Sequence, residues 1–343
     1  MDVEQYVSLL LQDIEPRIRR LMGLYCAPEA SGADIAGWFR DVDFEALRPE
    51  QSCMASALCA QREFVGVPQE LSPRLHGLIR YVRTLNAGMT AGLCALGALY
   101  AQAGIPVRLQ KDTALRLGYP GLCRRHMWQA DAAVSQERYA QAVAIAREGG
   151  YTVTESPMSA VVRRKNTECV VLHKTEAPLG ENARKVALSG AEFWIPDTQA
   201  LVVELAEEAF RGLASSAFQA KTVRWIMDLH PLFQTQTVDW EAAAAMAKSR
   251  GTGTWVRLAL ECYDALAPGN IPQGCWEAFA GAQAAAKLAA LARKHRERSP
   301  KGGKLQQRYW EARLARPDSA GAAMGLFLRG LVRSGIRRLG REG

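Results

Sequence analysis

Polar residues that could carry out chemistry gather between positions 111 and 131 of this chain. Lys111 can contact a phosphate or stand solvated at the end of a strand. Arg125 can hold phosphate oxygens with its forked guanidinium or form a structural salt bridge. Asp131 can ligate a metal ion or accept hydrogen bonds from turn amides. The stretch therefore indicates phosphate or metal-ion chemistry, with structural roles as the alternative.

Two neighbouring candidates have a structural reading beside the chemical one. Asp112 stands directly before Thr113, where its carboxylate is well placed to N-cap a helix that begins there. Its alternative role is that of a metal ligand. His173 has no partner at metal-ligand spacing, so we expect it to form a structural hydrogen bond rather than to act in catalysis.

A change of hydrophobic pattern near residue 104 places these side chains in a mixed α/β unit. Gly104-Ile105-Pro106 ends a long helical pattern, and the alternation that follows predicts a strand over 107–110. Beyond it the pattern predicts helix 113–118, strand 129–135, helix 136–149 and strands 151–154, 160–164 and 168–173. Strands and helices mixed in this order are typical of an α+β or α/β core.

Helical spacing dominates on both sides of that core. Apolar residues recur at helical intervals in the first hundred residues and again over 198–213, 217–232 and the stretch after Asp239. We expect a helical N-terminal region at 1–103, the core at 104–215 and a helical C-terminal region at 216–294. Residues 295–343 are predicted to form a basic linker and an amphipathic tail helix.

Positive charge is concentrated at the C-terminal end. The net charge is +8, but the residues from Lys287 onward hold 15 Lys and Arg against 4 Asp and Glu. Arg329, Arg333, Arg337 and Arg341 recur every four residues beside an apolar helical face. This tail could dock on an anionic membrane surface or an acidic protein, or it could pack on the body of the protein. Nucleic acid is not expected as a partner, because few aromatic residues interleave with the basic ones.

The remaining composition is typical of a globular cytoplasmic protein, here with the option of peripheral membrane attachment. No apolar run reaches the roughly 20 residues that span a bilayer, and the first residues include acidic ones. Eight cysteines are scattered without a C-x-x-C pair, so we expect reduced structural thiols.

Residues 90–265 resemble the uncharacterised nucleotidyltransferase family, which is often found near bacterial polysaccharide and peptide-modification genes. In that family a strand ending in Leu-Lys-Gly leads into a helix, Tyr-Pro follows, and Arg precedes a strand with Asp-x-Asp. An acidic-x-His strand end and helical Arg-Trp, Asp-Leu and Asp-Trp landmarks come later. The matching residues here are Lys111, Tyr119-Pro120, Arg125, Asp131, His173, Arg224-Trp225, Asp228-Leu229 and Asp239-Trp240.

The resemblance implies a nucleotidyltransferase-like core that moves a nucleotidyl group from a nucleoside triphosphate to a small-molecule, sugar or peptide acceptor. Such chemistry depends on divalent metal ions, here Mg²⁺. Two carboxylates one residue apart on a strand share a face, and a third from a neighbouring strand completes the set. By this likeness Asp131, Gln129 and Asp112 fall at catalytic or metal positions, and Lys111 and Arg125 at nucleotide-binding ones.

This sequence departs from the family pattern at three positions. Gln129 replaces the first aspartate of the pair and adds no negative charge. Val171, which can neither ligate a metal nor take a proton, stands at the third acidic position. Asp112 stands at the glycine that follows the lysine, and Asp112 or Glu168 could substitute for a missing carboxylate. The sequence therefore predicts a transferase with an impaired metal site, or alternatively a non-catalytic nucleotide-binding or scaffold protein of a bacterial biosynthetic assembly.

Overall fold

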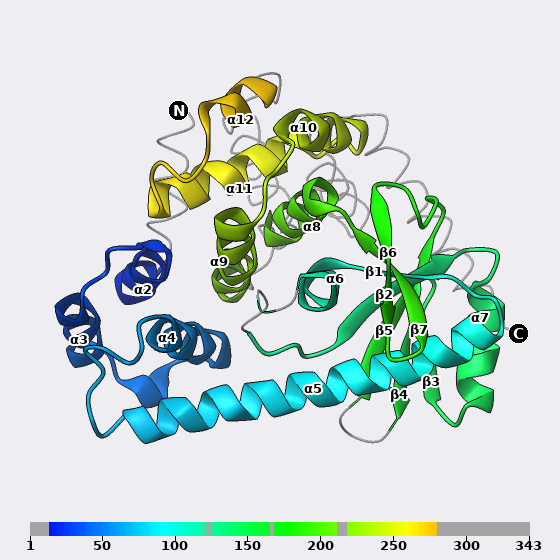
Figure 1. Cartoon of the computed structure of the whole chain (residues 1–343), viewed down its shortest axis with the longest axis horizontal. Coiled ribbons are helices and arrows are strands. Elements are labelled where there is room, and N and C mark those ends of the chain that lie inside the picture. The colour runs from blue at the N-terminus through cyan, green and yellow to red at the C-terminus, as the bar shows by residue number, and fades with distance from the viewer. Residues whose placement is uncertain (1–13, 120, 122–124, 165–167, 211–217, 280–343) are drawn as a thin grey trace, which may run out of the picture. The chain divides into compact units, whose positions relative to one another are not determined.

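The computed structural model describes residues 14–119, 121, 125–164, 168–210 and 218–279 (Figure 1). The chain divides into two compact units. One unit holds Arg20–Leu205 and Ile226–Thr237, and it carries the sheet. The other unit draws its described residues from Met1–Arg19, Ala206–Trp225 and Val238–Gly343.

A seven-stranded mixed sheet forms the centre of the first unit, with strand order β3-β4-β5-β2-β1-β7-β6. Strand β2 pairs in parallel with β5, and β1 pairs in parallel with β7, whereas the other neighbours are antiparallel. The strands are β1 (Val107–Leu109), β2 (Ala130–Ser135), β3 (Thr152–Glu155), β4 (Ser159–Arg164), β5 (Glu168–Thr175), β6 (Ala183–Leu188) and β7 (Ala191–Pro196).

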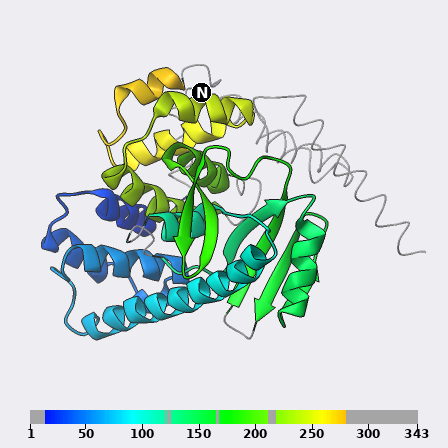
Figure 2. The same cartoon turned by 45° about the vertical axis from the view of Figure 1, so that its right-hand side comes forward.

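Helices pack against this sheet, and the longest is α5 (Ser72–Gln102), which runs along it beside α7 (Figures 1 and 2). Gly97 permits the close approach of α5 to β7, since a Cβ atom there would lie 2.4 Å from Cζ of the buried Phe193. The other elements confined to this unit are α3 (Gly32–Arg40), η1 (Phe44–Ala46), α4 (Pro49–Gln61), α6 (Lys111–Gly118) and α7 (Tyr139–Glu148).

The α+β architecture expected from the sequence is confirmed, including the first five strands of the sheet and both helices between them. Strands β6 and β7 were not predicted, although they form a hairpin around Ser189-Gly190. Both turn residues have positive φ, 46° and 82°, as the tight turns of two-residue hairpins require. Strand β7 matters to the architecture because it pairs directly with β1.

The second unit is helical in its described part. Helices α10 (Trp240–Ser249), α11 (Gly253–Leu266) and α12 (Gln273–Ala278) pack together. The buried carboxylate of Glu207 accepts a 2.6 Å hydrogen bond from the Thr252 hydroxyl, which fixes the start of α11. Helices α2 (Pro16–Cys26), α8 (Thr198–Phe210) and α9 (Phe218–Thr235) contribute residues to both units.

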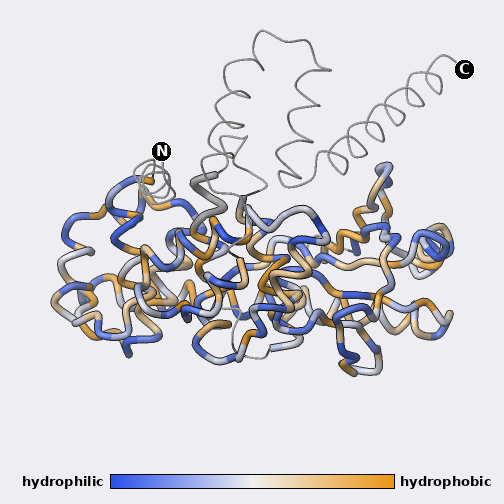
Figure 3. The backbone as a smooth tube through the Cα atoms, turned by 90° about the horizontal axis from the view of Figure 1, so that it is seen from above, coloured by the Kyte–Doolittle hydropathy of each residue, from blue (hydrophilic) through white to orange (hydrophobic). Residues whose placement is uncertain are grey.

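Hydrophobic and hydrophilic stretches alternate along the described part of the backbone (Figure 3). Accordingly, no described helix is long and apolar enough to span a bilayer. None of the seven described cysteines forms a disulfide. The predicted basic linker and tail helix, Pro120, Cys123 and the first turns of the predicted N-terminal helix lie outside the described residues.

Candidate functional site at the start of strand β2

Asp131 is positioned by the backbone of two neighbouring elements. It lies in β2 opposite Val171 of the parallel strand β5. Its amide N–H donates to the Thr113 hydroxyl at 2.8 Å, and its carbonyl accepts from the Gln110 N–H at 3.1 Å. Helix α6 is thereby fastened to the start of β2, so the Asp131 carboxylate is held at the point where strand and helix meet.

The buried Asp131 side chain is surrounded by hydrogen-bond donors. Its Oδ1 lies 2.8 Å from His173 Nε2 and 3.6 Å from Lys111 Nζ, and the Gln129 amide nitrogen lies 3.4 Å from both carboxylate oxygens. Burial opposes ionisation, but the hydrogen bond from His173 and the charge of Lys111 outweigh it and lower the pKa of Asp131. Asp131 is therefore an ionised carboxylate that His173 and Lys111 stabilise.

Lys111 adopts an unusual backbone conformation at the start of α6. Its φ is 52°, in the left-handed region that favours glycine. In the family pattern the glycine stands one residue later, at the position of Asp112, whereas the positive φ here is that of Lys111. The side chain of Lys111 is only partly exposed and reaches Asp131 from this turn.

Asp112 belongs to a buried ion-pair cluster with Arg125 and Asp228, and it also feels the charges of Asp131 and Lys111. Arg125 contacts the Asp112 carboxylate at 3.0 Å and forms a bidentate pair with Asp228 of α9, with contacts of 2.9 to 3.1 Å. Burial raises the pKa of Asp112 to about 6, because the nearby charge of Arg125 only partly offsets it. The expected N-cap role is wrong, since α6 begins at Lys111 and places Asp112 inside its first turn.

The structure thus divides the predicted site residues into two groups. Asp131, Gln129, Lys111 and His173 converge, whereas Asp112 and Arg125 face one another in the second cluster. Glu168 lies at the start of β5, and its side chain is outside the described residues.

Sequence reasoning missed two of the groups that position the site. The hydroxyl of Thr113 accepts from the Asp131 backbone, and Asp228 holds Arg125. Thr113 carried no sequence signal for this contact beyond its place after a predicted strand. Asp228 was identified as part of an Asp-Leu landmark and as an architectural residue on a helix, but neither signal reveals a partner 103 positions away.

Comparison with known proteins settles the family. Residues 52–268 match the family described as uncharacterised nucleotidyltransferase, which is more than half of the chain. The chain belongs to this family. A solution structure of the antibiotic-resistance factor ANT(2'')-Ia matches with 15% identity and a TM-score of 0.31, over 61% of this chain and 97% of that one. No curated protein matches the sequence.

Nucleotidyltransferases generally use divalent metal ions, so the donors of this site were tested against that need. Mg²⁺ prefers oxygen ligands, usually one or two carboxylates together with substrate phosphates. Asp131 is the carboxylate offered here, and an ammonium group and a histidine already occupy positions around it. In the part of the chain that the structure describes, no group of three or more His, Cys, Asp or Glu side chains could hold a metal ion. The described side chains around Asp131 therefore do not form a carboxylate cage for Mg²⁺.

Proposed function

We propose that this chain is a nucleotidyltransferase-family protein that binds a nucleoside triphosphate beside Asp131 and whose capacity for metal-dependent nucleotidyl transfer is impaired. One observation carries the proposal. Lys111 Nζ lies 3.6 Å from the buried carboxylate of Asp131, which by the family resemblance is the one acidic position of three that this chain keeps.

Phosphate binding is supported by the arrangement of Lys111 and α6. Lys111 begins this helix, so its ammonium group and the N–H groups of the first turn lie at the same helix end. Backbone N–H groups at a helix start, together with the helix dipole, favour anions. Arg125 is not assigned to the nucleotide, because Asp112 and Asp228 already engage its guanidinium. Lys111 is therefore the side chain proposed to contact the phosphates.

Nucleotidyl transfer would need more than this phosphate contact. The transferred phosphorus carries developing negative charge on its oxygens, and nucleotidyltransferases offset that charge with metal ions held by carboxylates. Gln129 and Val171 supply no negative charge to hold a second cation. Any Mg²⁺ that takes part would arrive with the nucleotide, with Asp131 as a single protein ligand.

Calorimetric titration with ATP, CTP, GTP and UTP, each with and without Mg²⁺, tests the proposal. At least one nucleotide should bind. Lys111→Ala should weaken the affinity for that nucleotide about tenfold or more, as loss of a charge-assisted contact predicts. Lys185→Ala is the matched control, because Lys185 is exposed on β6 and pairs with Glu192 at 3.5 Å. Asp131→Ala should likewise change the heat of nucleotide binding if the nucleotide lies beside that carboxylate.

The result that contradicts nucleotide binding is the absence of heat with all four nucleotides. It would favour the alternative function, a non-catalytic scaffold of a bacterial biosynthetic assembly. Mg²⁺-dependent release of pyrophosphate in the presence of small-molecule, sugar or peptide acceptors would instead show a working transferase and overturn the impaired metal site.

The location and the further partners are also proposals. A cytoplasmic place, with the basic tail docking on an anionic membrane surface or an acidic protein, rests on the charge of residues outside the described part of the chain. Docking on a membrane can be tested by co-sedimentation with anionic liposomes, in which the full chain is compared with a chain lacking residues 320–343. Equal binding of the two chains contradicts it.

A further inference from the structure

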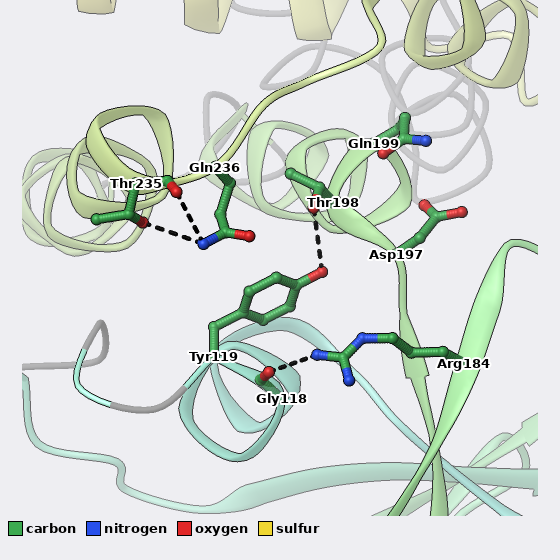
Figure 4. A pocket seen from close by; sticks show the side chains of 8 residues that line it. All are labelled: Gly118, Tyr119, Arg184, Asp197, Thr198, Gln199, Thr235 and Gln236. Atoms are coloured by element: carbon green, nitrogen blue, oxygen red, sulfur yellow. Dashed lines mark hydrogen bonds between the residues drawn. The ribbon is translucent and has the colours of Figure 1, made fainter.

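The sheet-bearing unit contains a cavity of about 580 Å³ that the Asp131 site does not use (Figure 4). It lies where α6 ends, where β7 passes into α8 and where α9 ends. Its size falls within the range of small-molecule sites. The cavity is lined by polar side chains that include those of Tyr119, Arg184, Asp197, Thr198, Thr235 and Gln236.

The wall at the end of α6 is built by close packing and hydrogen bonds. A Cβ atom on Gly118 would lie 2.5 Å from Cγ2 of the buried Ile195, so the helix end approaches β7 as closely as glycine allows. The Tyr119 hydroxyl donates to the Pro196 carbonyl at 3.2 Å and lies 3.4 Å from the Thr198 hydroxyl. Contacts between protein residues alone thus form this side of the cavity.

Arg184 is fixed at the same wall with donors to spare. One of its terminal nitrogens donates to the Gly118 carbonyl at 2.6 Å, and its guanidinium carbon lies 5.4 Å from the centre of the Tyr119 ring. A guanidinium has five N–H donors. No further contact of Arg184 with a described residue accounts for the others.

Asp197 and Gln236 supply acceptors on other sides of the cavity. One oxygen of Asp197 accepts from the Ala200 N–H at 2.9 Å, which leaves its second oxygen open among the described residues. The Gln236 amide nitrogen donates to the carbonyl and hydroxyl of Thr235, and Figure 4 shows the amide oxygen turned toward the cavity. Donors and acceptors thus face one space from separate elements.

The charges select the kind of ligand. One guanidinium and one carboxylate line the cavity, and they form no salt bridge with each other in the described structure. A phosphate or carboxylate ligand would be attracted by Arg184 and repelled by Asp197, and an ammonium ligand would meet the reverse. A hydroxyl group both donates and accepts, so it satisfies either residue and also suits Thr198, Thr235 and Gln236.

We propose that this cavity is a second ligand site, distinct from the Asp131 site, that binds a neutral hydroxyl-rich small molecule of the sugar or polyol class. The two sites adjoin opposite ends of α6, since Lys111 begins the helix and Gly118 ends it. At 1.5 Å per residue these ends are about 10 Å apart. A ligand in the cavity therefore leaves the phosphate position beside Lys111 free.

Saturation-transfer difference NMR on the full chain tests this site with defined probes. The neutral probes are glucose, galactose, N-acetylglucosamine and myo-inositol, and the comparators are glucose 6-phosphate and glycine. At least one neutral probe should give a signal with the unchanged protein. Gln236→Ala should weaken binding of the probe about two- to tenfold, the range for loss of a neutral hydrogen bond, and Asp197→Asn, which removes a charged acceptor, should weaken it about tenfold or more. Asn keeps the helix-capping ability of Asp at position 197.

Matched controls separate this proposal from the one for the nucleotide site. Gln141→Ala, on the exposed face of α7, should leave the probe signal unchanged. Lys111→Ala should keep the NMR signal of the neutral probe and weaken nucleotide binding in calorimetry. Gln236→Ala should weaken the probe signal and leave nucleotide binding unchanged. Three results overturn the sugar site: no neutral probe binds, a neutral probe binds equally to Gln236→Ala, or only the phosphate ester or glycine depends on Gln236 and Asp197.

Discussion

The buried carboxylate of Asp112 should make the stability of the protein fall as pH rises through the mildly acidic range. Its pKa is raised from 3.8 to about 6 in the folded protein. Between these two values the folded state holds a proton that the unfolded state has lost, so raising the pH favours unfolding. This contribution is absent in Asp112→Asn, because the amide does not titrate and has nearly the same shape.

The magnitude follows from the two pKa values. With 3.8 for the unfolded and about 6 for the folded chain, the linkage relation gives a loss on the order of 1 kcal/mol between pH 5.0 and 7.5. The free energy of unfolding of the natural protein should therefore fall by that amount relative to Asp112→Asn over this interval. Urea unfolding followed by tryptophan fluorescence, at both pH values and with equal m-values, measures the difference.

A control variant and a contrary result make this reasoning testable. Asp34, an exposed residue in the capping box of α3, has its pKa lowered by hydrogen bonds from Ser31. Its contribution is lost only as pH falls below 3.8, so Asp34→Asn should show no change in relative stability between pH 5.0 and 7.5. If the stability of the natural protein relative to Asp112→Asn does not change between pH 5.0 and 7.5, the pKa of Asp112 is not raised, the charge of Arg125 dominates and the burial argument is refuted.

Substitutions at three packing and turn positions should lower the free energy of unfolding, which urea unfolding measures in each case. Thr113→Val leaves the buried Asp131 N–H without its acceptor and should cost about 1–3 kcal/mol, whereas Thr113→Ser should restore most of that stability. Gly97→Ala should cost about 1–3 kcal/mol through its clash with Phe193, and adding Phe193→Leu should recover part of the loss; no recovery would contradict this packing account. Gly190→Ala places a side chain at φ 82° and should cost about 1 kcal/mol, while Gly190→Asn should cost less because asparagine tolerates this region.

Local patterns predicted those parts of the fold that local forces decide. Alternation after Gly104-Ile105-Pro106 located β1, and the strands and helices up to β5 followed from period and turn residues. The β6–β7 hairpin was missed although Ser189-Gly190 is a turn signal of the kind that joins two strands. That omission was an error of reading, because the information was present in the sequence.

The candidate site was harder to predict because its contacts join distant segments. His173 reaches Asp131 only because β5 lies parallel to β2 in a register that places Ala133 opposite His173, and periodicity does not set that register. Asp112 was misassigned because the helix begins at Lys111 in a left-handed conformation that the residue type does not announce. Its true partner, Arg125, is held from α9 by Asp228.

If Gln129 and Val171 stand where the family has carboxylates, as the resemblance implies, the folded site has different electrostatic needs from those of the family pattern. Three buried carboxylates on adjacent strands would repel one another and would require cations for their ionised forms to persist. Here the ionised Asp131 carboxylate is matched by the Lys111 ammonium and the His173 hydrogen bond, which stabilise its charge in the described structure. A divalent ion would have to compete with both contacts for Asp131. A phosphate, in contrast, needs only a share of Lys111 and of the start of α6, so the proposed nucleotide binding does not depend on the ligands that the transfer step would need.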